Sequence, residues 1–437
     1  MAQFRKDTHT YLPQEKTIFE VVMLADQYGN LVGPANPSGA AVDAFGRARV
    51  SQPYTLWESF HRYQDNGKVS TANSATGSSY THRPNESVID CTITNTANSY
   101  VYRESSRVFA YQPGKSLQIL QTFVMAPSQV GLRQRFGYFG TQNGHYLEVE
   151  DNTNYFVRRS YVTGAVVNTR VAQEDWNVDK LDGTGPSLLT LDLSKAQILW
   201  TDVEWLGVGS VRQGFVIDGQ FITCHVWNHA NQPGANSTYM TTACLPVRAE
   251  IENYNSMANT STLKIICTTV ISEGGFEPRG RAKTCGHEPD TATTMTTAGT
   301  YYPIAAIRLK SNRADGVVLP KNVTLLGLTG NGSRLRYKII TGATVSGGTW
   351  VDAGSDSSVQ YNISGTGLSG GTDLYSGYQA INNQGSVAID IGAGGDFFRY
   401  QLERNSFANT NTTFVLAATG AGNGDTCIGG IDWEETT

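Results

Sequence analysis

The sequence has no long apolar run and little charge of either sign. Of its 437 residues only 16% are charged, the formal net charge is -5 and the pI is near 5.8. No apolar stretch approaches the ~20 residues that a helix needs to span a bilayer, and the first residues contain no apolar signal region. Nucleic-acid-binding domains are usually basic, with Lys and Arg gathered on one face. We therefore expect no membrane insertion, no classical secretion signal and no nucleic-acid partner.

Cysteine is scarce and shows no metal-binding pattern. The six cysteines form no C-x-x-C pair, and their spacing suits neither a zinc site nor a dense disulfide framework. The sequence also lacks an H-E-x-x-H motif and a P-loop, so it predicts no cofactor of those classes. We expect free thiols in a chain made in a reducing cytoplasm, with Cys224 and Cys267 acting as small buried hydrophobic residues.

Strand and turn chemistry dominates what is present. Glycine occurs 46 times, and the stretches between glycines and prolines are rich in Val, Ile, Thr, Tyr and Phe. Hairpin turns are predicted at Asn143-Gly144, Thr163-Gly164 and Asp218-Gly219. No stretch shows an amphipathic helical period. The sequence predicts an all-β protein with a large β-sandwich or jelly-roll body, concanavalin-like, plus a smaller C-terminal β-sandwich.

Changes in composition divide the chain. Residues 1–40 combine one short apolar run with a Gly-, Pro- and Asn-rich stretch and predict an extended N-terminal arm. Strand patterns then continue through a body at 41–280. Residues 276–300 are polar and rich in Pro and Thr, which predicts a linker at 281–300. Short strands resume in a C-terminal sandwich at 301–437.

Two groups of acidic residues could carry chemistry. Oxygen-bearing side chains at close spacing are typical of calcium loops, so a calcium site is possible as the one cofactor; its candidate ligands are Asp175, Asn177, Asp179 and Asp182. The spacing departs from an EF-hand, and an Asx-rich loop that braces strands is the competing interpretation. Glu148 with Glu150, or Asp202 with Glu204, would each share one strand face, as in a glycosidase dyad or in any solvated strand.

The stretch "DAFGRARVSQPYTLWESFHRYQDN", residues 43–66, is crowded with aromatic and charged residues. It resembles a segment of a family of virion structural proteins of tailed phages and large viruses. The block "EDWNVDKLDGTGPSLLTLDL" and the later "YMTTACLPVRAEIEN" are similar to further segments of that family. The resemblance runs from about residue 41 onward. It brings no catalytic residues.

The resemblance implies that residues 43–66 are an assembly element. Arg47, Arg49, Glu58 and Arg62 would form ion pairs within or between protomers. Trp57, Phe60 and Tyr63 would be buried anchors of the interface.

We therefore expect a non-enzymatic virion structural protein, made in the host cytoplasm and displayed in the tail, baseplate or fibre apparatus or on the head. Its partners would be other virion proteins and copies of itself as a homo-oligomer. Two alternatives stay open: a carbohydrate-binding receptor protein for a host-surface glycan, and a polysaccharide depolymerase acting through paired carboxylates.

Overall fold

The computed structural model describes residues 24–25, 31–32, 53–65, 67–277, 279–329, 334–381, 387–390 and 400–436. This part of the chain is all-β, as predicted, apart from two 3-10 turns, η1 (Gln173–Asp175) and η2 (Ser311–Arg313). A separate short pair joins β1 (Leu24–Ala25) to β2 (Leu31–Val32). Within the described residues, no helix has the length and hydropathy of a membrane-spanning segment.

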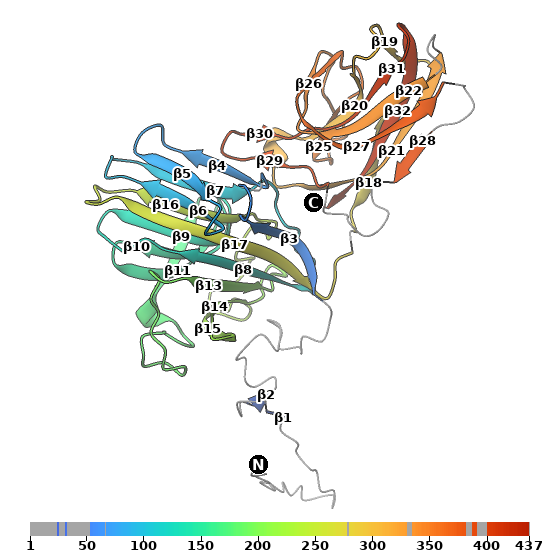
Figure 1. The fold of residues 1–437 in the computed structure, drawn as a ribbon. Coiled ribbons are helices and arrows are strands. Elements are labelled where there is room, and N and C mark those ends of the chain that lie inside the picture. Colours follow the sequence, from blue (N-terminus) through green and yellow to red (C-terminus); the bar gives the residue numbers. More distant parts are fainter. Residues whose placement is uncertain are drawn as a thin grey trace, which may run out of the picture.

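The body consists of two stacked sheets (Figure 1). The seven-stranded sheet has the order β12-β11-β10-β9-β16-β7-β4. Its strands are β4 (Val69–Asn73), β7 (Tyr100–Ser105), β9 (Leu132–Phe139), β10 (Gly144–Glu150), β11 (Thr153–Ser160), β12 (Val167–Ala172) and β16 (Val247–Asn253).

The second sheet of the body has eight strands. Its order is β15-β14-β13-β8-β17-β6-β5, and β3 pairs with β17 off this path. Its strands are β3 (Tyr54–Phe60), β5 (Ser78–Arg83), β6 (Val88–Ile93), β8 (Ser116–Val124), β13 (Gln197–Val203), β14 (Val211–Ile217), β15 (Gln220–Trp227) and β17 (Ser261–Glu273). Phe123 of this sheet stacks on Phe136 of the other, with ring centroids 4.3 Å apart, so the core lies between the sheets.

The predicted hairpins are confirmed. The hairpin of β9 and β10 has a four-residue loop, 140–143, so Asn143 ends the loop and Gly144 is the first residue of β10. Thr163-Gly164 lies in the turn between β11 and β12. Asp218 and Gly219 form the two-residue loop between β14 and β15, and both have positive φ angles, 52° and 76°. A turn with two positive φ angles matches the twist of the flanking strands, which explains why this dipeptide is a strong hairpin signal.

The C-terminal part is a second, smaller β-sandwich around Trp433. One sheet contains β18 (Arg281–Gly286), β19 (Thr293–Met295), β21 (Val317–Thr329), β28 (Val387–Asp390) and β32 (Asp425–Thr436). The other contains β20 (Tyr302–Leu309), β22 (Arg334–Thr341), β24 (Val351–Asp352), β25 (Val359–Asn362), β27 (Thr372–Ala380) and β31 (Phe414–Gly420). Two small pairs complete it: β23 (Thr344–Ser346) with β26 (Gly367–Ser369), and β29 (Arg404–Asn405) with β30 (Thr410–Asn411).

The structure corrects two sequence predictions. Residues 281–300 are not a plain linker, because β18 and β19 lie within them and both pair with β32. Only Cys285 and Met295 of these strands are buried, so most of their polar side chains face solvent and resemble a loop in sequence. All six cysteines are free thiols, but Cys267 is exposed on β17 whereas Cys224 is buried as expected.

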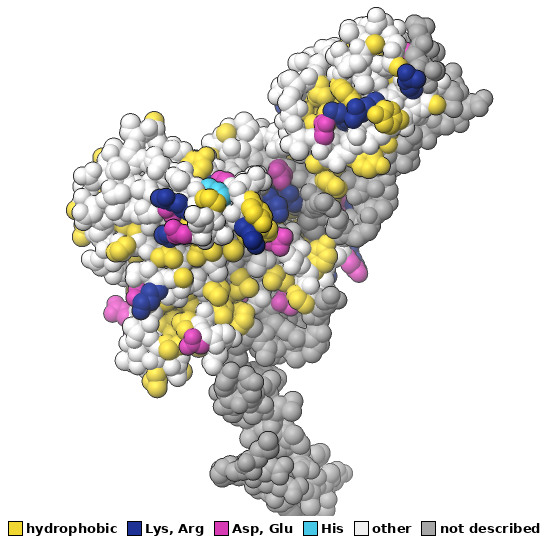
Figure 2. Space-filling model, in the orientation of Figure 1, with side chains coloured by type: hydrophobic (Ala, Val, Ile, Leu, Met, Phe, Trp, Pro, Cys, Tyr) yellow, Lys and Arg dark blue, Asp and Glu magenta, His cyan; other side chains and the backbone are white. Residues whose placement is uncertain are grey.

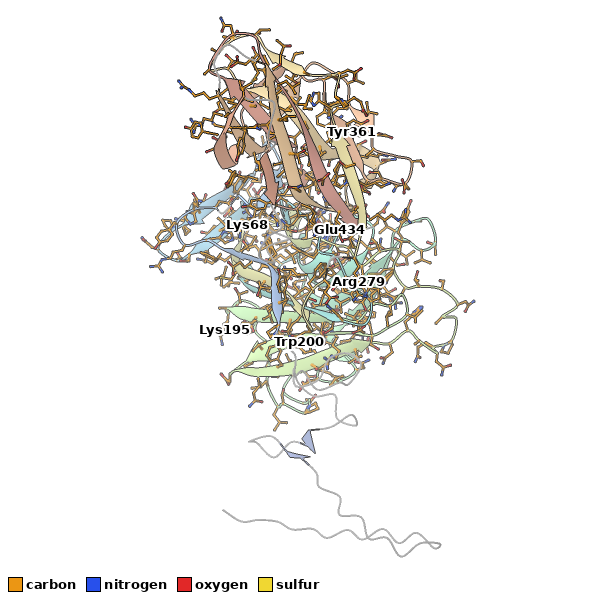
Figure 3. The ribbon with its side chains drawn as sticks, turned by 90° about the vertical axis from the view of Figure 1, so that its right-hand side faces the viewer. Lys68, Lys195, Trp200, Arg279, Tyr361 and Glu434 are labelled. Carbon is orange, nitrogen blue, oxygen red and sulfur yellow. The ribbon has the colours of Figure 1, made fainter. Side chains whose placement is uncertain are left out.

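The two sandwiches are joined by direct contacts. Val317 and Leu319, at the start of β21, belong to the hydrophobic core of the body. The Arg404 N–H donates to the Ser106 carbonyl at 2.7 Å, and the Gln401 amide donates to the Val108 carbonyl at 2.9 Å. Lys68 and Glu434 lie near this junction in the side view of Figure 3. The segment around residues 401–404 therefore fastens the C-terminal sandwich to the body.

Candidate functional site

The outer face of the seven-stranded sheet carries a cluster of buried charged side chains. Leu147 and Val149 of β10 point into the core, so Glu148 and Glu150 point to the opposite face. The strand register places Glu148 beside Arg135 on β9. We call this surface the charged face; its ionic residues are Glu104, Glu148, Glu150, Glu250, Glu252, Arg133, Arg135, Arg170 and Arg248.

Arg135 is the centre of the charged face. Its Nε lies 2.6 Å from Glu148 Oε2, and its Nη1 lies 2.7 Å from Glu250 Oε2. All three side chains are buried. Burial alone would lower the pKa of Arg135, but the charges of Glu250 and Glu148 outweigh burial and raise it. For Glu250, burial would raise the pKa, but Arg248 and Arg135 hold it below its ordinary value.

The ion pairs form one continuous row across the sheet. Toward the edge strand β12, Glu148 Oε1 lies 2.7 Å from Arg170 Nε, and Arg170 also contacts Glu150 at 2.8 Å. Toward the other edge, Arg248 joins Glu250 at 2.6 Å to Glu104 at 3.0 Å. This row of ion pairs ends in the C-terminal sandwich, where Arg404 Nη1 lies 2.9 Å from Glu104 Oε1. The charged face is therefore also part of the junction between the two sandwiches.

Aromatic rings lie beneath the arginines. Phe139 and Tyr146 are fully buried on the charged face. The guanidinium groups of Arg159 and Arg248 lie 5.5 Å and 5.7 Å from the centroid of the Phe139 ring. Planar guanidinium groups stack well on aromatic rings, so the rings hold these arginines flat on the sheet.

The acidic residues of the charged face are all engaged by cations. A glycosidase needs one carboxyl group that can donate a proton to the glycosidic oxygen. Each of the five glutamates of the charged face instead contacts at least one arginine. The other acidic pair is engaged as well: Asp202 pairs with Arg212, and Glu204 accepts a hydrogen bond from the Tyr111 hydroxyl at 2.7 Å.

Three of the four predicted calcium ligands bind backbone groups. Asp179 accepts hydrogen bonds from the N–H groups of Leu181 and Ser187, and Asp182 accepts one from Thr184. Asn177 is bonded to the backbone of Val226 on β15, and Asp175 is exposed in η1. In the described ranges, no three His, Cys, Asp or Glu side chains lie close enough to hold a metal ion together. The calcium site stays a prediction from spacing, and the observed role of these side chains is to brace the loop.

The predicted assembly residues divide into buried and exposed groups. Trp57 is buried on β3 and lies 5.5 Å from the Phe109 ring. Phe60 and Tyr63 are 53% and 79% exposed, and the Arg62 guanidinium lies 5.1 Å from the Tyr63 ring. Glu58 is exposed and forms no ion pair with any described residue, and Arg47 and Arg49 lie outside the described ranges. Trp57 is thus a core residue of the single chain, whereas Phe60 and Tyr63 face solvent.

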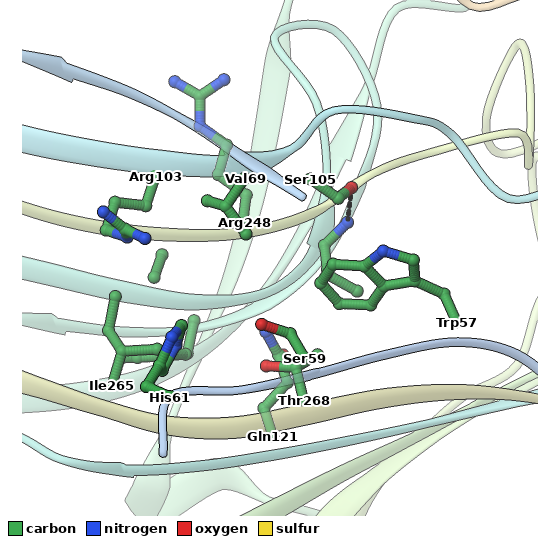
Figure 4. A pocket seen from close by; sticks show the side chains of 13 residues that line it. Trp57, Ser59, His61, Val69, Arg103, Ser105, Gln121, Arg248, Ile265 and Thr268 are labelled. Carbon is green, nitrogen blue, oxygen red and sulfur yellow. Dashed lines mark hydrogen bonds between the residues drawn. The ribbon is translucent and has the colours of Figure 1, made fainter. Parts of the chain in front are cut away.

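A small cavity of about 30 Å³ lies between the sheets next to β3 and β4. Figure 4 shows Trp57, Ser59 and His61 on one side of it and Arg103 on the other. His61 is buried, and burial lowers its pKa from 6.5 to about 4; the charge of Arg103 adds to this, while Asp65 opposes it. Arg103 in turn pairs with Asp65 at 2.6 Å. The imidazole is therefore neutral at neutral pH.

We expect stability to fall on mild acidification because of His61. Its folded pKa of about 4 lies below its ordinary 6.5, so its contribution is complete above pH 6.5 and is lost as the pH falls toward 4. The loss amounts to roughly 3 kcal/mol at about 1.4 kcal/mol per pKa unit. Urea unfolding at several pH values would measure it. His61→Gln should reduce the slope of the stability curve between these pH values, and the slope that remains comes from groups such as His225, whose pKa burial also lowers to about 4. His229→Gln, at a half-buried position, should leave the slope unchanged. If the free energy of unfolding changed with pH equally in both variants, the role assigned to His61 would be contradicted.

No protein-family model and no curated protein sequence matches the chain. Solved structures give distant matches. A protein of unknown function from Shewanella oneidensis MR-1 is 12% identical, with 55% of this chain and 93% of that chain covered and a TM-score of 0.34. The Bacillus licheniformis β-glucanase is 11% identical, with 49% and 96% covered and a TM-score of 0.33. Arcelin-5, a lectin-like defence protein from Phaseolus vulgaris, is 9% identical, with 52% and 100% covered and a TM-score of 0.30. Scores this low carry no inference about ligand or activity.

Proposed function

We propose that this chain is a non-enzymatic virion structural protein of a tailed phage that also binds a host-surface glycan without cleaving it. The non-enzymatic part depends on one observation: all five glutamates of the charged face are held by arginines. A carboxylate bound in ion pairs to arginine is not available to protonate a glycosidic oxygen as the general acid of glycoside hydrolysis. The depolymerase alternative therefore has no suitable residue pair on this face.

The virion part depends on the resemblance of residues 43–66 to virion structural proteins. The solvent-facing Phe60 and Tyr63 of that segment support a contact with another chain, because large exposed aromatic residues are typical anchors of protein interfaces. A surface used in many copies needs only weak contacts in each copy, which suits both assembly and attachment.

Glycan binding without cleavage is tested with the purified full-length chain and host-surface polysaccharide. We expect binding in a glycan array and no release of reducing ends above a buffer control. Release of reducing ends that disappears in Glu148→Gln would overturn the non-enzymatic proposal. Lys195→Ala, a change at an exposed position of the body, serves as the matched control.

The virion role is tested on particles and on the free chain. We expect peptides of this chain in mass spectra of purified particles, and a native mass that corresponds to a homo-oligomer. Phe60→Ala and Tyr63→Ala should shift that mass toward the monomer. Absence of the chain from purified particles would overturn the proposal.

A further inference from the structure

The outer face of strand β22 presents a row of cations. Leu335, Tyr337 and Ile339 point into the core of the C-terminal sandwich. Because side chains alternate along a strand, Arg334, Arg336 and Lys338 point outward, at intervals of roughly 6.8 Å. We call these three residues the basic row.

Tyrosines flank the basic row. Tyr378 of β27 lies opposite Arg336 in the register and is 71% exposed, and its ring centroid lies 5.6 Å from the Arg336 guanidinium. Lys338 Nζ lies 4.5 Å from the centroid of the Tyr301 ring. In Figure 2, basic and hydrophobic side chains lie together on the C-terminal sandwich. Because Tyr378 is 71% exposed, its ring contributes little buried area to the packing of the sandwich and stays open to a ligand.

Two of the three cations of the basic row have no acidic partner in the described ranges. Lys338 pairs with Asp373 at 2.6 Å, but neither Arg334 nor Arg336 forms an ion pair with any other residue in the described ranges. On the charged face, in contrast, four arginines are each bound to glutamate: Arg133, Arg135, Arg170 and Arg248. A local positive surface on a chain of net charge -5 favours a small anionic group in the ligand.

The same sheet face carries a second cation–aromatic pair. Arg308 of β20 lies 4.1 Å from the Trp350 ring centroid. Ala306, two residues before Arg308, packs on this face with Ile340 and Val415, so Arg308 points to the same side as the basic row. Aromatic rings next to a cation thus lie toward both edges of the sheet.

We propose that this face of the C-terminal sandwich binds an anionic glycan, one that carries carboxylate or sulfate groups. The inference rests on the proposed glycan-binding function and names the surface and the ligand class. The Tyr378 ring would cover the apolar face of a sugar, and Arg336 would bind its acidic group with two parallel hydrogen bonds. A nucleic acid is disfavoured because proteins that bind it are usually basic overall, which this chain is not.

The experiment uses the full-length chain and immobilised polygalacturonate, heparin, neutral dextran and single-stranded DNA. We expect binding to the two acidic polysaccharides, none to dextran, and weaker binding at high salt, because exposed charges are screened. Arg336→Ala removes hydrogen bonds to a charged group, and Tyr378→Ala removes a stacking surface for a sugar ring. Each variant should weaken binding about tenfold.

A matched control lies on the body. Lys195→Ala removes a cation that is 76% exposed. This variant should bind like the unmodified chain, and all three variants should unfold at the same temperature. Glycan binding that survives in Arg336→Ala and Tyr378→Ala would overturn this site while leaving the proposed function intact. No binding to any glycan would overturn the glycan part of the proposed function, and preference for DNA would overturn the ligand class.

Discussion

Arg135→Ala should lower the free energy of unfolding by about 3–5 kcal/mol, the cost typical of removing one partner from a buried ion pair. Glu148 and Glu250 would remain buried without the guanidinium that they share. The loss is a large fraction of the 5–15 kcal/mol that stabilises a typical domain. Urea unfolding followed by tryptophan fluorescence would measure it.

The pH dependence of the Arg135 effect identifies its cause. Without Arg135, the pKa of Glu250 should rise, since burial disfavours the ionised carboxylate and Arg135 is one of the charges that hold this pKa down. A carboxyl group with a raised folded pKa stabilises the fold when it is protonated, so the variant should recover relative stability as the pH falls. The difference in the free energy of unfolding between Arg135→Ala and the unmodified chain should therefore become smaller as the pH falls. Lys195→Ala, which removes an exposed pair with Asp192, should cost less than ~0.5 kcal/mol. A loss for Arg135→Ala that does not change with pH would contradict the electrostatic explanation.

Phe156→Ala should destabilise the body by about 3–5 kcal/mol through a different mechanism, the opening of a core cavity. Phe156 of β11 is fully buried and stacks on Trp176, with ring centroids 4.4 Å apart. It also lies 6.3 Å from Phe215 in the opposite sheet, so it connects the two layers. Calorimetry should show a lower melting temperature, by roughly 2–4 °C for each kcal/mol in a body of this size.

Phe60→Ala is the matched control for the core substitution. Phe60 is an aromatic residue of the same body, but it is exposed on β3. Its removal should change the stability of the isolated chain by less than ~1 kcal/mol. A loss as large as that of Phe156→Ala would show that Phe60 packs in the folded chain, contrary to its exposure.

Local chemistry made the strands and turns predictable. Asp218-Gly219 specifies its hairpin because the two residues adopt positive φ angles readily, which depends on no distant contact. The strands β18 and β19 were missed because their polar exposed side chains give no alternation of apolar residues. Their strand conformation depends on pairing with β32, which lies more than a hundred residues later in the chain.

Only the acidic residues of β10 on the charged face could be predicted from the sequence. Glu148 and Glu150 were recognised as residues on one strand face, but their arginine partners were not. The alternation of charges in the runs "RQR", "EVE" and "RAEIE" was the available signal, since it places every second residue on one face. The partners themselves follow from the order of the strands: Glu104 and Arg404 are 300 positions apart. For Asp179, the sequence alone does not distinguish two structures, because closely spaced side-chain oxygens suit a calcium loop and an Asx-rich turn equally well.

Glu104 and Arg404 also bear on how such a protein can change during evolution. Glu104 is buried between Arg248 of the body and Arg404 of the C-terminal sandwich. A recombination event that replaced only the C-terminal sandwich would have to supply a new cation at the position of Arg404, or leave the carboxylate of Glu104 short of a partner. We therefore expect the two sandwiches to be inherited together, with tolerated exchange points located before the body and not between the sandwiches.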